Sequence, residues 1–79
     1  MYIEHVFRGL EDRIGKEAVN NLFAGSCYWT EAFWKHRHEH PAIERAYYEL
    51  RAVEIRDKHG LDYALGYMRE HGYNGINWQ

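Results

Sequence analysis

Apolar residues recur at helical spacing in four segments of the chain. In residues 2–14 they stand three and four positions apart, which places them on one stripe of a helix. Gly15 follows this stripe and is suited to end the helix. Residues 2–7 are partly β-prone, so a short strand is the alternative there. The apolar members of the stripe are Ile3, Val6, Phe7, Leu10 and Ile14.

The longest segment spans residues 17–37, and a single helical phase fits all of it. Its apolar positions form a broad arc, with polar positions gathered on the opposite side. We therefore predict one continuous helix through Gly25 at the centre of the fold. Trp29 and Phe33 lie in the apolar arc and are expected in the core, whereas Tyr28 faces the polar side and is expected to be exposed.

A proline separates this segment from the next. Pro41 suits the first turn of a helix, where its missing N–H needs no partner, and it disfavours helical geometry at His40. The third helix is therefore predicted to begin at Pro41 and to end before Gly60, and the fourth to span residues 61–71. Their core stripes are Ile43, Ala46, Tyr47, Leu50 and Val53, then Leu61, Ala64, Leu65 and Met68.

These segments predict an all-α fold, a small bundle of three or four helices with a long central helix. Residues 1–79 are too few for more than one hydrophobic core, so we expect a single domain. An apolar fraction of 46% and an aromatic fraction of 16% supply the large side chains that a small core needs. Cys27 is the only cysteine, which excludes an internal disulfide, and we interpret it as a buried or bystander thiol.

Charge and hydropathy limit the classes of function that we expect of this chain. The first ten residues lack the apolar core of a signal peptide, and no apolar run approaches the roughly 20 residues of a membrane span. We expect a cytoplasmic protein. Ten basic and twelve acidic side chains are interleaved, which is unlike the basic footprint of a nucleic-acid binder. The acids and glycines form no catalytic constellation, so we expect neither an enzyme nor a cofactor.

Residues 36–40 contain three histidines. His36 and His40 are four positions apart, the spacing that zinc-binding helices use. Arg37, however, stands where the zincin pattern requires glutamate, a second ligand pair is missing, and Pro41 disturbs the helix at His40. We predict that these residues and His38 hold no metal. A metal-binding or metal-sensing protein is the alternative.

The third helix carries a second apolar strip opposite its core stripe, and arginines border it. The fourth helix adds two tyrosines one turn apart. Tyrosine beside arginine is typical of protein interfaces. The alternatives are that the third helix is sandwiched, or that the tail with Ile76 and Trp78 covers the strip. The predicted partner-binding residues are Tyr48, Ala52, Ile55, Arg45, Arg51, Arg56, Tyr63 and Tyr67.

The function that these patterns favour is a non-enzymatic protein-binding module, whose partner is another protein or a second copy of the chain. A virus- or plasmid-encoded inhibitor of a host defence or regulatory complex, such as an anti-CRISPR-type inhibitor, is the specific expectation. It rests on how often small single-domain proteins act in this way. A nucleic-acid-binding helical module is a further alternative, with Lys58 joining the three arginines, although interleaved glutamates oppose it.

Overall fold

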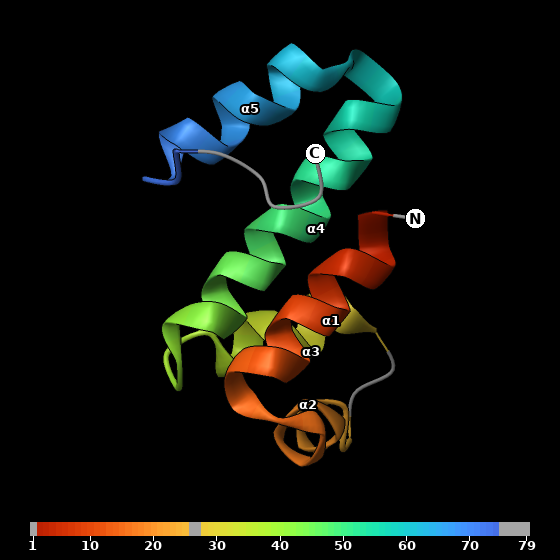
Figure 1. Cartoon of the computed structure of the whole chain (residues 1–79), viewed down its shortest axis with the longest axis vertical. Coiled ribbons are helices and arrows are strands. Elements are labelled where there is room, and N and C mark those ends of the chain that lie inside the picture. The colour runs from red at the N-terminus through yellow and green to blue at the C-terminus, as the bar shows by residue number, and fades with distance from the viewer. Residues whose placement is uncertain (1, 26–27, 75–79) are drawn as a thin grey trace.

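The computed structural model describes residues 2–25 and 28–74, and within them the chain forms five helices and no strand (Figure 1). The helices are α1 (Tyr2–Ile14), α2 (Lys16–Leu22), α3 (Trp29–His36), α4 (Pro41–His59) and α5 (Leu61–Glu70). The predicted all-α class is confirmed, and residues 2–7 are helical rather than a strand. The molecule measures 33 × 23 × 22 Å along its principal axes.

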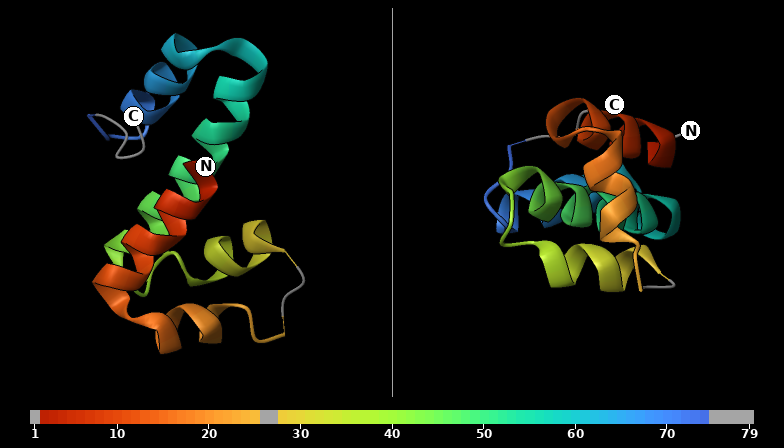
Figure 2. Two further views of the ribbon diagram at one scale, coloured as in Figure 1. Left: turned by 45° about the vertical axis from the view of Figure 1, so that its right-hand side comes forward. Right: turned by 90° about the horizontal axis from the view of Figure 1, so that it is seen from below.

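The central element of the fold is α4, the longest helix at 19 residues. It contacts α1, α3 and α5, whereas α2 contacts α1 and α3. Figures 1 and 2 show α1, α2 and α3 around the first half of α4, and α5 folded back beside its second half. Among the described helices, α5 contacts α4 alone. The position of α5 therefore depends on a single helix–helix interface.

The prediction of one continuous central helix over residues 17–37 is wrong. The structure has two short helices there, because α2 ends at Leu22 and Gly25 adopts a φ of +79° that helices do not allow. Backbone N–H groups of Phe23 and Ala24 close the last turn of α2 on the carbonyls three residues earlier. Leu22 and Trp29 are seven residues apart, about two helical turns, so the break preserves the phase of the apolar pattern.

Both ends of α4 lie where the sequence predicts them. His40 is extended, with φ −157° and ψ 138°, and its Nδ1 accepts a hydrogen bond from the Ala42 N–H at 3.0 Å. At the other end Gly60 has φ +97°, and its N–H donates to the Arg56 carbonyl at 3.0 Å. A side chain at that φ would be strained, so glycine permits the sharp reversal from α4 into α5.

All five helices contribute buried apolar side chains to one core, and Phe33 is among its largest members. The Phe33 side chain is completely buried, and the rings of Phe7, Phe23 and Trp29 lie within 6.3 Å of its ring. The predicted core position of Phe33 is thus confirmed, and Trp29 packs against the core half-buried. Tyr28 is 71% exposed, as predicted.

We expect Phe33→Ala to lower the free energy of unfolding by about 3–5 kcal/mol, because it removes a fully buried ring and leaves a cavity. Tyr28→Ala, which removes an exposed ring one turn before α3's core residues, should change it by no more than about 0.5 kcal/mol. Urea denaturation of both variants tests this pair. Equal losses of stability would contradict the core assignment.

Candidate partner-binding site

The predicted apolar strip of α4 is partly covered within the chain. Ala52 is completely buried, whereas Tyr48 and Ile55 are half-buried and pack against the core. The helix that lies beside this half of α4 is α5 (Figure 2). For Ala52, the structure therefore shows the sandwiched arrangement that was the alternative to a partner surface. The tail residues Ile76 and Trp78 lie outside the described residues.

Tyr48 connects α4 to the end of α5. Its ring stacks on His71 with 4.2 Å between centroids and an interplanar angle of 19°. The rings of Tyr67 and Tyr73 lie 6.1 and 5.9 Å away. Aromatic pairs at these distances stabilise the packing beyond the area that they bury. Tyr48 therefore has a structural role in holding α5, which makes it a poor position for testing partner binding.

Three of the predicted residues, Ile55, Tyr63 and Tyr67, line a common groove of about 530 Å³ between α4 and α5. We call this hollow the tyrosine groove. Its other lining residues are His59, Asp62, Gly66 and Glu70. The Tyr63 side chain is 68% exposed, and its ring lies 5.7 Å from that of His59. The tyrosine groove thus combines apolar walls with an accessible aromatic ring.

Gly66 keeps part of the tyrosine groove free of side-chain atoms. It lies inside α5, and apart from its chain neighbours and the backbone of its own helix, a Cβ atom built on it would meet no atom within 4 Å. Glycine inside a helix is less stable than alanine by roughly 0.5–1 kcal/mol, so neither packing nor helix stability explains this residue. The sequence signal for the groove is a helix-interior glycine between Tyr63 and Tyr67, which a pattern of apolar side chains does not reveal.

The charged residues that line the tyrosine groove are acidic. Asp62 and Glu70 stand on α5, and neither lysine nor arginine is among the described lining residues. His59 adds an imidazole ring to the lining. The acidic lining favours a ligand that carries basic groups beside an apolar one.

The three predicted arginines do not border the groove. Arg45 Nε donates to Oε1 of the buried Glu49 at 2.7 Å, which offsets the cost of burying that carboxylate. Arg51 donates to the Tyr47 hydroxyl at 3.3 Å and also pairs with Glu54. Arg56 is half-buried. The spacing in the sequence predicts that these arginines border one apolar strip. In the structure, Arg45 instead pairs with Glu49, and Arg51 contacts Tyr47 and Glu54.

The histidines of residues 36–40 face separate partners. The ring of His36 hydrogen-bonds to Glu39, His40 caps α4, and His38 lines a second hollow near the start of α4. Within residues 2–25 and 28–74, no three His, Cys, Asp or Glu residues are grouped to hold a metal ion. That these histidines bind no metal stays a prediction. Cys27, interpreted as a buried or bystander thiol, lies outside the described residues.

We expect the free energy of unfolding to fall as the pH rises above about 10, the ordinary pKa of tyrosine. Burial raises the pKa of Tyr67, with Tyr47 adding to the rise and Arg51 opposing it. The native state then holds the phenolic proton more tightly than the unfolded chain, so this contribution is complete below the ordinary pKa and is lost as the pH rises through the native pKa. In Tyr67→Phe the decline between pH 9 and 11.5, measured by urea denaturation, should be shallower. An identical slope would contradict this environment for Tyr67.

No described helix is long and apolar enough to cross a membrane. Comparison of the chain with protein-family models, curated proteins and solved structures gives no match.

Proposed function

We propose that the chain is a non-enzymatic protein-binding module and that the tyrosine groove receives an apolar side chain of its partner. The observation that carries this proposal is Gly66, which leaves the groove open at a cost in helix stability. A small domain benefits from every stabilising residue, since its total stability is modest. An alanine at this position would stabilise the helix, so the glycine has a cost that an open groove for a partner accounts for.

The chemistry of the groove favours a peptide segment as its occupant. Exposed tyrosine offers a large contact area for little loss of side-chain entropy, and for this reason it is enriched at protein interfaces. A volume of about 530 Å³ accommodates one or two anchoring side chains. Asp62 and Glu70 complement lysine or arginine beside the anchor. We therefore propose an amphipathic helix of another protein, with an apolar anchor and basic flanking residues.

An inhibitor is one form of this function. A small domain that occupies a surface of a larger complex blocks whatever that surface normally binds. A virus- or plasmid-encoded inhibitor of a host defence or regulatory complex fits this mode, and it stays a prediction from the sequence.

Gly66→Leu is the sharpest test, because it fills the groove without removing a core contact. Leucine favours helices over glycine by nearly 1 kcal/mol, and the position faces open space, so the melting temperature should not fall. Helical peptides selected from a display library on the unmodified protein serve as probes. We expect them to carry an apolar anchor flanked by lysine or arginine, and to bind Gly66→Leu roughly tenfold or more weakly in fluorescence anisotropy.

Tyr63→Ala should weaken the binding of the same peptides. Tyr28→Ala should leave their binding unchanged, because this exposed tyrosine is far from the groove residues in sequence. Peptides that bind all three variants equally would overturn the assignment of the groove. Sedimentation velocity adds a separate check: a dimer that Gly66→Leu dissociates would show that a second copy of the chain, and not another protein, occupies the groove.

A further inference from the structure

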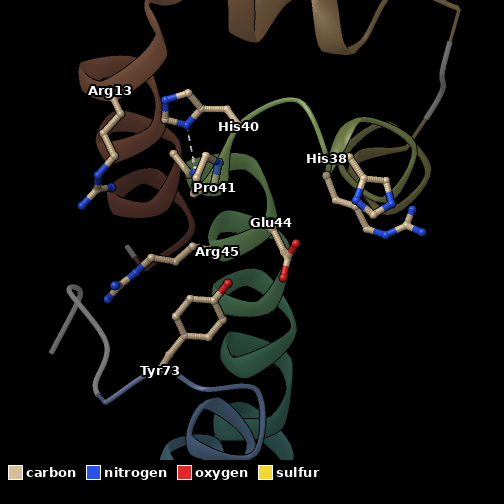
Figure 3. A pocket seen from close by; sticks show the side chains of 9 residues that line it. Arg13, His38, His40, Pro41, Glu44, Arg45 and Tyr73 are labelled. Atoms are coloured by element: carbon tan, nitrogen blue, oxygen red, sulfur yellow. Dashed lines mark hydrogen bonds between the residues drawn. The ribbon is translucent and has the colours of Figure 1, made fainter.

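A second hollow, also of about 530 Å³, lies at the opposite end of α4 from the Gly60 turn. It forms where the last turn of α1, the α3–α4 connection, the first turn of α4 and Tyr73 meet (Figure 3). We call it the arginine cleft, because Arg13, Arg37 and Arg45 all line it. Residues from distant parts of the sequence meet here, which is why the sequence alone does not reveal it.

The arginine cleft is electropositive although the chain is not. The whole chain carries a formal charge of −2. The lining of the cleft contains three arginines and Glu44, and Glu49 pairs with Arg45, which leaves a formal charge of +1 with His38 and His40 neutral. A positive lining of this kind favours an anion. The first turn of α4 adds the positive end of a helix dipole.

Two of the arginines have donors to spare. Arg13 makes one long hydrogen bond, from Nη1 to the Gly9 carbonyl at 3.4 Å, and Arg45 uses its Nε for Glu49. A guanidinium carries five N–H donors, so most of them are left for a ligand. Figure 3 shows the Arg13 and Arg45 side chains projecting to the same side of Pro41, with Glu44 on the other.

His40 contributes a further donor. Its Nδ1 accepts the Ala42 N–H at 3.0 Å, so the proton of the neutral ring is on Nε2. In Figure 3 this second ring nitrogen faces the side on which Arg13 lies. The capping bond fixes the ring orientation, and the N–H donor is therefore held in place before any ligand arrives.

We propose that the arginine cleft binds a phosphate group, either inorganic phosphate or the phosphate of a phosphorylated molecule. The planar guanidinium forks of Arg13 and Arg45 match the geometry of phosphate oxygens, and His40 Nε2–H supplies a third contact. Glu44 disfavours anions on its own side of Pro41, which confines the phosphate to the side of Arg13 and Arg45. This site is separate from the tyrosine groove, and neither depends on the other.

The test is a titration with inorganic phosphate and, separately, with phenyl phosphate, followed through the Arg Nε–Hε signals in 1H–15N NMR spectra. Chloride at matched ionic strength is the reference. We expect saturable shifts of the Arg13 and Arg45 signals with at least one of the two compounds, and the tighter binder identifies the source of the phosphate group. Shifts that follow ionic strength alone, or that never saturate, would overturn the proposal.

Arg13→Gln should weaken phosphate binding about tenfold or more, since it removes one charged donor and leaves the Arg45–Glu49 pair intact. Its melting temperature without phosphate should be unchanged, because Arg13 is exposed. Arg69→Gln is the matched control, with the same loss of charge at an exposed position of α5 outside the cleft. Equal weakening by the two variants would show charge screening rather than a site and would overturn the proposal.

Discussion

The structure depends on α4 burying side chains on opposite sides at once. One side meets α1 and α3, and the other meets α5. Ala52, which is completely buried, lies between Tyr48 and Ile55 on the face that α5 covers, and its small side chain permits close approach of the two helices. Because α5 contacts no other described helix, everything built on α5 depends on this face. The main role of the second apolar strip of α4 is therefore to form the interface with α5.

The two hollows follow from the same arrangement. The reversal at Gly60 sets α5 against the end of α4, and the tyrosine groove forms where α5 presents glycine instead of a side chain. Near the start of α4, the ion pair between the half-buried Arg45 and the buried Glu49 holds an arginine in the lining of the arginine cleft. Removing either member of that pair would leave a buried or unpartnered charge, so the pair also fixes the geometry of the cleft.

The sequence predicts three of the five helices, because glycine or proline marks where they begin or end. Gly15 ends α1, Pro41 begins α4, and Gly60 separates α4 from α5. The prediction for residues 17–37 is wrong because α3 begins seven positions after the last residue of α2, about two helical turns, so the apolar pattern keeps its helical phase across the break. The predicted partner-binding residues include three that line the tyrosine groove, Ile55, Tyr63 and Tyr67, whereas Gly66 has no side chain and does not contribute to the apolar pattern. The arginine cleft combines Arg13 with residues that follow it by 24 or more positions. The periodicity of apolar residues within a helix does not predict which distant residues come together in the fold.

Amide hydrogen exchange tests the two-sided burial of α4 most directly, because protection reports how each backbone segment opens. The structure predicts that amides of residues 46–53 in α4 are the slowest of the described residues and exchange only through global unfolding. Amides of α5 should exchange faster, through a local opening that releases this helix from α4 alone. If residues 46–53 exchanged as fast as the exposed helix ends, or if α5 were the most protected element, α4 would not be the centre of the fold.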